Sequence, residues 1–315
     1  RENDVVPLDV VEAPLSLPGH IADLRARAAS SDDTVDAQLA ATLLALMARE
    51  GITSAQPERW LGAGGTPTTN EEYQGDVKLS PSQFERALAC PLRWFLTTIG
   101  ADGPSNAAAS LGTLVHALAE ENPHGTPEEL TEALEARIEE LGYNLDTWAG
   151  RHADRHARAI VDNLASYLVG VPGRVEVEQM VEAQVEGVTI RGRMDRLEHV
   201  DEGVRVTDLK TGKGGHSAKT VPDNPQLAAY QMALLASGEQ VAGARIALLG
   251  GDKPKTFDQK PLEGKTLEEW RGKVREVAAI ARGPYFEATP SEDACRYCSF
   301  DRLCPARERG RKVVE

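Results

Sequence analysis

The four cysteines of this chain are placed so that they restrict how it can fold. Cys90 stands alone, and Cys295, Cys298 and Cys304 follow it after about 200 residues. In a chain without a secretory signal, cysteines are more often metal ligands or catalytic groups than disulfides. A zinc ion and an iron–sulfur cluster both accept four thiolates, and either would close a long loop between Cys90 and the end of the chain. On the spacing alone a cluster, a zinc site and free thiols all remain open.

The composition argues against a membrane-spanning protein and against a basic protein that coats nucleic acid. The chain has 315 residues, 41% of them hydrophobic, and no stretch approaches the roughly 20 apolar residues that a membrane helix needs. Its formal net charge is -14, which leaves room only for a local basic groove. The start, Arg1-Glu2-Asn3-Asp4, has no apolar signal region and no initiator Met. We therefore expect a cytoplasmic chain that is a fragment or a processed product.

Residues 1–76 are expected to form a separate helical segment that leads into the rest of the chain. Apolar residues recur at helical spacing in residues 36–50, and residues 62–75 are rich in Gly, Thr, Pro and Asn, which is typical of a linker. Residues 77–315 are expected to form the second domain, and all the motifs discussed below lie in it.

The hydrophobic period changes along residues 77–315. Ser80-Pro81-Ser82-Gln83 has the pattern of a capped helix start, and Pro91 interrupts that helix just after Cys90. Thr266-Leu267-Glu268-Glu269 has the pattern of a capping box. These patterns predict an α/β fold whose sheet contains an antiparallel meander and is flanked by helices. The expected helices cover residues 80–89, 110–121, 126–142, 148–169 and 266–282, with one more opening at Asn224-Pro225, and the expected strands cover 175–185, 188–200, 204–210 and 244–249.

One strand ends in a carboxylate and an amine that share a face. In Asp208-Leu209-Lys210 the two-residue alternation places Asp208 and Lys210 on the apolar inner face and turns Leu209 away. Asp195 lies on the neighbouring strand, and a two-residue loop would bring it to the same face. Two converging carboxylates suit a hard cation such as Mg²⁺, with Lys210 offsetting charge in the transition state. On these residues alone, a surface hairpin with an Asp–Lys pair is the alternative.

Three further side chains suit such a site. On a helical wheel His116 lies away from the apolar stripe of its helix, on the side of Gly112, so its imidazole can serve as a ligand. Gln226 and Tyr230 are four residues apart and share a helix face that suits contacts with phosphate or base. Taken singly, a polar-face histidine and an ordinary amphipathic helix explain these residues as well.

These residues belong to four short motifs, in the order Gly112-Thr113-Leu114-Val115-His116, Gly192-Arg193-Met194-Asp195, Asp208-Leu209-Lys210 and Gln226-Leu227-Ala228-Ala229-Tyr230. The series resembles that of the RecB-type PD-(D/E)XK nucleases, and the resemblance covers residues 79–307. It implies a restriction-endonuclease-like core, in which a central mixed sheet is flanked by helices.

The resemblance also implies a role for each motif residue. His116, Asp195, Asp208 and the carbonyl of Leu209 would bind the metal, which would be Mg²⁺ or Mn²⁺. Lys210 would be the catalytic lysine and would act together with Asp195 and Asp208.

The remaining motif residues would serve the substrate. Gln226 and Tyr230 would contact DNA and support the site. Glu178 precedes the motif strands and matches none of the four motifs.

The cysteines add a second resemblance. One cysteine before the nuclease motifs and three after them resemble the iron–sulfur staple of the AddB-like nucleases, a cluster that ties the start of the domain to its end. The local sequence Cys90-Pro91-Leu92-Arg93-Trp94-Phe95 is similar too. The resemblance implies a structural [4Fe-4S] cluster on Cys90, Cys295, Cys298 and Cys304.

The family implies cleavage of DNA phosphodiester bonds, as an exonuclease acting on single strands. It also implies end resection and double-strand-break repair within a helicase–nuclease complex, of which the actinobacterial AdnAB complexes are the most similar. Gly264-Lys265-Thr266 lacks the preceding glycine of a nucleotide-binding loop, so we expect the motor on another part or a partner subunit. The alternatives are a freestanding exonuclease of the CRISPR-adaptation type and a non-catalytic DNA-binding scaffold of the same fold.

Overall fold

The computed structural model describes residues 16–30, 33–57, 71–101, 111–171, 173–296 and 298–307. The chain divides into two compact units, Arg1–Glu71 and Glu72–Glu315. Most of the predicted linker, residues 62–75, lies outside the described residues, as does Ser110 at the start of the second predicted helix. No helix in the described ranges combines the length and apolarity needed to cross a bilayer.

The first unit contains two helices and a short 3₁₀ turn. Helix α1 (Leu17–Ser30) packs on α2 (Thr34–Arg49), and η1 (Thr53–Ala55) follows. Asp33 caps α2, because its Oδ1 accepts a hydrogen bond from the amide of Val35 at 2.9 Å. The buried side chains of this unit are Ile21, Leu24, Ala40, Leu44 and Ala55.

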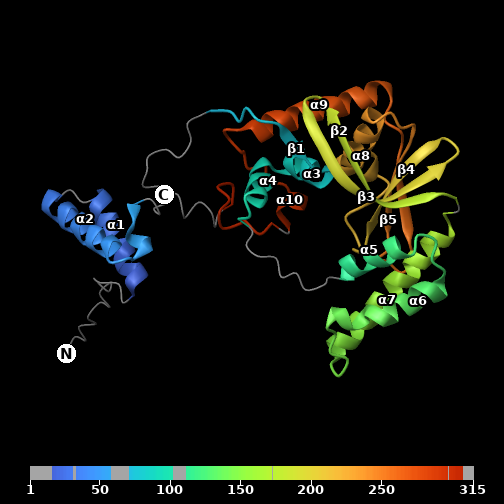
Figure 1. Cartoon of the computed structure of the whole chain (residues 1–315), viewed down its shortest axis with the longest axis horizontal. Coiled ribbons are helices and arrows are strands. Elements are labelled where there is room, and N and C mark those ends of the chain that lie inside the picture. Colours follow the sequence, from blue (N-terminus) through green and yellow to red (C-terminus); the bar gives the residue numbers. More distant parts are fainter. Residues whose placement is uncertain are drawn as a thin grey trace, which may run out of the picture. The chain divides into compact units, whose positions relative to one another are not determined.

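The second unit is built on a six-stranded mixed sheet (Figure 1). Five strands follow in the order β1-β3-β4-β5-β6, and β2 also pairs with β3. The β2-β3-β4 segment is the predicted antiparallel meander, whereas β5 runs parallel to β4 and β1 runs parallel to β3. This architecture confirms the predicted fold class. The strands are β1 (Val77–Leu79), β2 (Val175–Val185), β3 (Val188–Val200), β4 (Gly203–Lys210), β5 (Val241–Leu248) and β6 (Lys255–Gln259).

A two-residue turn fixes which side chains of β3 and β4 share a face. The last ladder pair before the turn is Val200 with Gly203, and Arg196 pairs with Thr207 further along. The next position in this register sets Asp195 against Asp208. The two-residue loop that the sequence argument required is therefore present.

One face of the sheet is covered by helices from both ends of the domain. Helices α3 (Pro81–Ala89), α8 (Pro225–Ala236) and α9 (Gly264–Arg282) lie on this side in Figure 1, and α4 (Pro91–Thr98) follows α3. The predicted capping box of α3 is confirmed, because Ser80 Oγ accepts from the amide of Gln83 at 3.2 Å and Gln83 Oε1 accepts from the amide of Ser80 at 2.9 Å.

The start of α9 was predicted wrongly. It begins at Gly264 rather than at Thr266, and its N-cap residue Glu263 makes no side-chain capping bond. The reason lies just upstream, where the amide of Leu262 donates to the buried Gln231 Oε1 at 3.1 Å and fixes where the chain turns. Tertiary contacts therefore outweigh the local capping pattern here.

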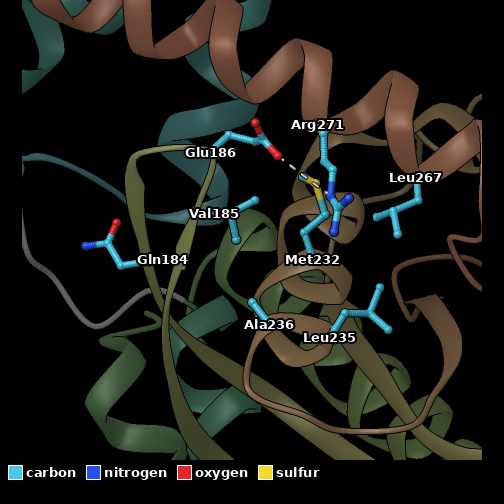
Figure 2. Close-up of a pocket in the computed structure, with 8 residues that line it drawn as sticks. All are labelled: Gln184, Val185, Glu186, Met232, Leu235, Ala236, Leu267 and Arg271. Carbon is cyan, nitrogen blue, oxygen red and sulfur yellow. Dashed lines mark ion pairs between the residues drawn. The ribbon is translucent and has the colours of Figure 1, made fainter.

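A small surface pocket lies where α8 and α9 meet the turn between β2 and β3 (Figure 2). Met232 and Leu235 come from α8 and Leu267 from α9. Glu186 and Arg271 form an ion pair at 3.8 Å across it. The floor of the pocket is apolar, and its one acidic residue, Glu186, is already paired with an arginine. The pocket therefore offers no cluster of metal ligands.

The other face of the sheet is covered by α5 (Leu111–Glu121), α6 (Pro127–Arg137), η3 (Ile138–Leu141) and α7 (Trp148–Val169). Leu209 of β4 is 1% exposed in the core on this side, whereas Val206 of the same strand is buried in the opposite core. The predicted alternation along β4 is thus confirmed. Two short elements complete the unit: η4 (Val221–Asp223) before α8, and α10 (Glu292–Arg296) in the tail.

Candidate metal centre

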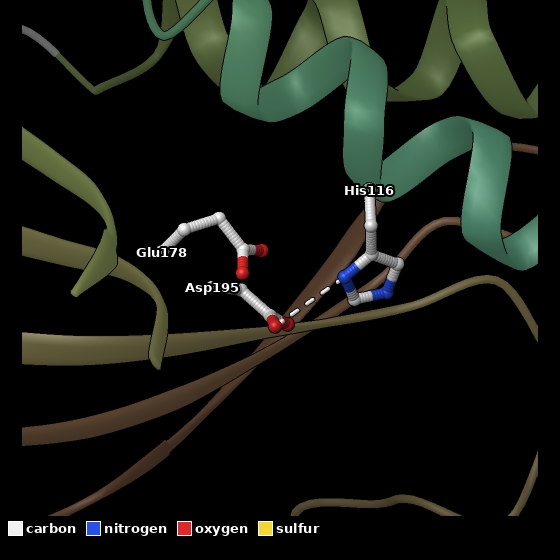
Figure 3. Close-up of side chains that lie close together, drawn as sticks. All are labelled: His116, Glu178 and Asp195. Atoms are coloured by element: carbon white, nitrogen blue, oxygen red, sulfur yellow. Dashed lines mark ion pairs between the residues drawn. The ribbon is translucent and has the colours of Figure 1, made fainter. Parts of the chain in front are cut away.

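Three possible metal ligands from three elements converge at the middle of the sheet (Figure 3). His116 of α5, Glu178 of β2 and Asp195 of β3 each offer one donor atom, and these atoms all lie within 4.8 Å of one another. His116 Nδ1 is 3.3 Å from Asp195 Oδ1. His116 therefore does not face open solvent on an ordinary polar helix face, which was the alternative left open by the sequence.

Glu178 reaches this point because of where it sits on β2. The flanking ladder pairs are Val177 with Arg196 and Gln179 with Met194, so Glu178 lies opposite Asp195. Its φ of 52° interrupts the regular strand at this position. Its carboxylate also forms an ion pair with Arg193. Burial raises the pKa of Glu178, and the nearby Asp195 adds to that effect.

Buried Asp208 and half-buried Lys210 form an ion pair at the end of β4. Lys210 Nζ is 2.8 Å from Asp208 Oδ2, and Asp208 is only 5% exposed. A surface hairpin is excluded by this burial. Desolvation raises the pKa of Asp208 to about 6, although the Lys210 charge opposes the rise. Burial alone would lower the pKa of Lys210, but Asp208, Asp195 and Glu85 together raise it, so Lys210 keeps its proton.

Asp195 is held by the backbone of the strand beside it. The amide of Leu209 donates to Asp195 Oδ2 at 2.8 Å, while Asp195 Oδ1 faces His116. Asp195 and Asp208 thus stand opposite each other on adjacent strands, an arrangement that is unfavourable for two anions without a cation between them. The proximity of Asp195 also contributes to the raised pKa of Asp208.

Gln226 and Tyr230 extend from α8 towards these groups. Gln226 Nε2 donates to Asp208 Oδ1 at 2.8 Å, and Lys210 Nζ donates to Gln226 Oε1 at 3.3 Å. The Tyr230 hydroxyl donates to the carbonyl of Arg193 at 2.7 Å. Both side chains therefore brace the site through protein contacts.

The glycine of the second motif makes room for this bracing. A Cβ at Gly192 would lie 2.6 Å from Pro81 Cδ and 3.1 Å from Tyr230 Cε1. Any side chain here would push away α3 or the Tyr230 ring. Gly192 thus allows α3 and α8 to approach β3 beside the acidic residues.

Glu85 belongs to the same neighbourhood, although no sequence motif pointed to it. It lies on α3, where Asn224 Nδ2 donates to its Oε1 at 3.3 Å. Burial raises the pKa of Glu85, and the Lys210 charge partly offsets that rise. Glu85 is therefore a second carboxylate beside Lys210 that no motif contains.

The donors fit a divalent cation. Carboxylate oxygens suit Mg²⁺ or Mn²⁺, and an imidazole nitrogen is tolerated better by Mn²⁺ than by Mg²⁺. Burial first, and the opposed Asp195 in addition, raise the pKa of Asp208, so a cation at this point would favour its ionised form. The hydrogen bond and charge of Asp195 raise the pKa of His116 despite its partial burial, so a cation would have to displace a proton held there.

The four cysteines meet at one place in the second unit. Cys90, Cys295, Cys298 and Cys304 line a single small pocket together with Arg93. Arg93 Nη1 donates to the carbonyl of Ala294 at 2.9 Å. Four thiols around one pocket can together bind one metal ion or cluster. This arrangement argues against four unrelated free thiols.

Other contacts hold the tail against α4 beside that pocket. The amide of Leu92 donates to the carbonyl of Glu287 at 3.1 Å, and Thr289 Oγ1 donates to the carbonyl of Ala89 at 3.0 Å. The rings of Phe95 and Phe286 stack at 4.1 Å with an interplanar angle of 8°. Packing and hydrogen bonds thus join the end of the domain to its beginning at the place where the cysteines lie.

Known proteins match this chain along most of the second unit. A family model described as the PD-(D/E)XK nuclease superfamily matches residues 78–305. The gene 69 protein of Mycobacterium phage D29 is 25% identical over 265 residues, which cover 72% of this chain and 96% of that protein. The gene 69 protein of Mycobacterium phage L5 is 27% identical over 133 residues, which cover 41% of this chain and 44% of that protein.

Two solved structures are also similar over much of their length. The protein SSO0001 matches with a TM-score of 0.38 and 16% identity, covering 86% of this chain and 97% of that one. A candidate exonuclease from Eubacterium rectale matches with a TM-score of 0.41 and 15% identity, covering 76% and 93%. Because the family model spans well over half of its residues, the chain belongs to the PD-(D/E)XK nuclease superfamily.

Proposed function

We propose that this chain is a divalent-metal-dependent deoxyribonuclease that acts on single strands of DNA as an exonuclease. The observation that carries the proposal is the convergence of His116, Glu178 and Asp195 within 4.8 Å, beside the ion pair of Asp208 and Lys210. Membership of a nuclease superfamily supports hydrolysis of phosphodiester bonds. The metal identity, the single-stranded substrate and the residue roles are part of the proposal.

The acidic residues and the imidazole would hold the cation. The proposed ligands are His116, Asp195, Asp208 and the carbonyl of Leu209. Glu178 is added to them because its carboxylate lies within 4.8 Å of the donor atoms of His116 and Asp195. A bound Mg²⁺ or Mn²⁺ would supply Lewis-acid polarisation of the scissile phosphate.

Lys210 would act on the phosphate itself. Its ammonium keeps its proton because neighbouring carboxylates raise its pKa, and Asp208 holds it at 2.8 Å. A fixed positive charge at this point offsets the negative charge that grows on the phosphate during cleavage. Gln226 positions both Asp208 and Lys210, and we assign it and Tyr230 to contacts with the bound strand as well.

The cysteines are proposed to hold a [4Fe-4S] cluster. The four thiols line one pocket, and the pattern of one cysteine before the nuclease motifs and three after them supports the cluster. Zinc bound by the same four thiolates is the alternative.

The colour of the protein tests this assignment. Protein purified without oxygen should be brown, with broad visible absorption and about four irons per chain. A colourless protein with one zinc per chain would mean that the cluster was assigned wrongly.

We place the chain as the nuclease part of a helicase–nuclease complex for end resection and double-strand-break repair, of the AdnAB kind and with an AddB-like staple. The motif series and the cysteine spacing support this placement. DNA and a motor-bearing subunit would be its partners.

A freestanding exonuclease is the second candidate. The match to the gene 69 protein of phage D29 spans 96% of that protein, which leaves no room in it for a motor region. Adding a stoichiometric motor subunit should increase degradation of duplex ends if the complex is correct. Degradation of single strands by this chain at full rate without any partner would favour the freestanding enzyme.

A nuclease assay tests the proposal as a whole. Labelled single-stranded DNA with Mn²⁺ should be degraded by the natural sequence, and Asp208→Ala should reduce the rate at least about 1000-fold, because the buried acid that holds Lys210 is lost. Asp201→Ala, at the exposed turn between β3 and β4, is the matched control and should keep full activity. Equal rates for Asp208→Ala and Asp201→Ala would reject the proposed site. If neither the natural sequence nor any variant degrades DNA, the chain is a non-catalytic scaffold.

A further inference from the structure

The first half of α7 carries a group of basic and aromatic side chains on its exposed surface. We call this surface the α7 face and define it by Trp148, Arg151, His152, Arg155 and His156. The Trp148 side chain is 71% exposed, and its ring stacks on the imidazole of His152 at 5.3 Å and 4°. Trp148, His152 and His156 follow one another at intervals of four residues, so they lie along one side of the helix.

The α7 face is unfavourable for the isolated protein. Cations near the N-terminus of a helix oppose the helix dipole, and the first turn of α7 contains no acidic residue to compensate. An indole with most of its area in water gains no burial energy. In a chain of net charge -14, two exposed arginines beside an exposed aromatic pair fit an anionic ligand with flat rings.

The cations of the α7 face are available to such a ligand. Arg155 is exposed and makes no ion pair with any residue in the described ranges. Arg151 is exposed and donates through Nη1 only to the carbonyl of Leu145, at 2.8 Å, so its charge is not neutralised by an acid. Asp154 of the same helix turn is already engaged, because it pairs with Arg158 at 3.0 Å.

The α7 face continues towards the metal centre through the loop after β4. Lys213 and His216 of this loop line a cavity of about 730 Å³, together with Glu85 and Asn224. Lys213 also lies close enough to His156 that its charge, after burial, lowers the pKa of that imidazole. The loop begins directly after Lys210, and Lys213 is its third residue.

The position of α7 relative to the metal centre is fixed by buried contacts. Asn163 Nδ2 donates to the carbonyls of Leu249 and Gly251 at 2.7 and 2.9 Å. The amide of Leu249 in turn donates to the carbonyl of Lys210 at 2.8 Å. At the other end of α7, Gly150 packs against the preceding loop so closely that a Cβ would lie 1.9 Å from the carbonyl oxygen of Asn144.

We propose that the α7 face is a second binding site for an unpaired nucleic-acid strand, outside the metal centre. The arginines would contact phosphates, and a base would stack on the pair formed by Trp148 and His152. A single strand fits better than a duplex, because only an unpaired base exposes its flat face to an aromatic ring. The inference rests on the proposed function in taking nucleic acid as the ligand.

Strand binding measured without catalysis tests this inference separately from the nuclease assay. Fluorescence anisotropy of a labelled 20-nucleotide oligothymidine is followed in EDTA, where a metal-dependent nuclease does not act. Trp148→Ala and the double variant Arg151→Gln/Arg155→Gln should each weaken binding about tenfold. Trp148→Ala should leave binding of a 20-base-pair duplex within twofold of the natural sequence, because stacking needs an unpaired base.

Matched variants separate this site from general attraction of charge. Tyr285→Ala removes another ring that is 68% exposed, and Lys78→Gln removes an exposed cation on β1. Both should bind oligothymidine within twofold of the natural sequence. Binding by the α7 variants that stays within twofold, an equal loss in the controls, or no strand binding by the natural sequence would each overturn the inference. Weakened binding in a protein that never cleaves DNA would leave the inference standing and reject only the proposed function.

Discussion

The metal centre and the cysteine pocket are built in opposite ways. Asp195 and Leu209 of the metal centre are hydrogen-bonded across a separation of 14 residues, whereas Arg93 and Ala294 beside the cysteines are 201 residues apart. At the metal centre, one hairpin with a two-residue turn brings Asp195 and Asp208 together, and Glu178 and His116 join them from β2 and α5. The cysteine pocket exists only when the two ends of the domain meet. The metal centre takes no residue from the tail and survives its loosening, whereas a centre made from the two ends also stabilises the fold that brings them together.

Removing one cysteine should have the largest effect on this comparison, because, of the two centres, only the cysteine pocket joins the two ends of the domain. Cys90→Ser would open a ligand-closed loop of about 200 residues, and loop-closure entropy predicts a loss of about 5 kcal/mol in the free energy of unfolding. Chemical denaturation measures this loss, and the visible absorption should disappear with it. Ser299→Ala, an exposed change in the same tail, is the control and should alter neither. Unchanged stability and colour in Cys90→Ser would show that the cysteines do not act as a staple.

The metal centre should make stability depend on pH in the absence of metal. Because the folded pKa of Asp208 is about 6, above the usual value of 3.8, the folded protein holds this proton more tightly than the unfolded chain does. Stability should therefore fall as pH rises from about 4 to about 6, by about 3 kcal/mol, and stay lower above that range.

Asp208→Asn should remove this fall without changing the visible absorption of the cysteine pocket. Urea unfolding in EDTA at a series of pH values from 4 to 8 measures both proteins. A pH dependence that is identical in the natural sequence and in Asp208→Asn would show that the proton is held elsewhere.

The smallest effect should come from the bracing between α8 and β3. Tyr230→Phe removes the hydrogen bond to the carbonyl of Arg193 at 2.7 Å and should reduce stability by about 1 kcal/mol. Calorimetry of Mn²⁺ binding should show affinity reduced several-fold, because Arg193 carries the ion pair to Glu178. Tyr285→Phe is the exposed control. Equal Mn²⁺ affinity in both variants would mean that α8 does not position the ligands.

Local rules explain why much of the metal centre could be predicted from the sequence. Alternation along β4 and a two-residue turn suffice to place Asp195, Asp208 and Lys210 on one side, and helical periodicity places His116 away from its core stripe. The sheet and most helices follow from the same periodicities.

Tertiary contacts explain what the sequence could not predict. Glu178 enters the site because β2 pairs with β3 and departs from regular strand geometry there. Glu85 approaches Lys210 only because α3 packs beside α8, where Asn224 holds its carboxylate. The start of α9 was missed because buried Gln231, and not a local cap, fixes the chain before it.

Crystals of the protein loaded with Mn²⁺ test the central claim most directly. Anomalous scattering should show a peak bonded to His116, Glu178, Asp195 and Asp208, with Lys210 beside it. The same crystals of Asp195→Ala should lack the peak. A Mn²⁺ peak elsewhere in the domain, with the donor atoms of His116, Glu178 and Asp195 too far apart to bind one ion, would contradict the account.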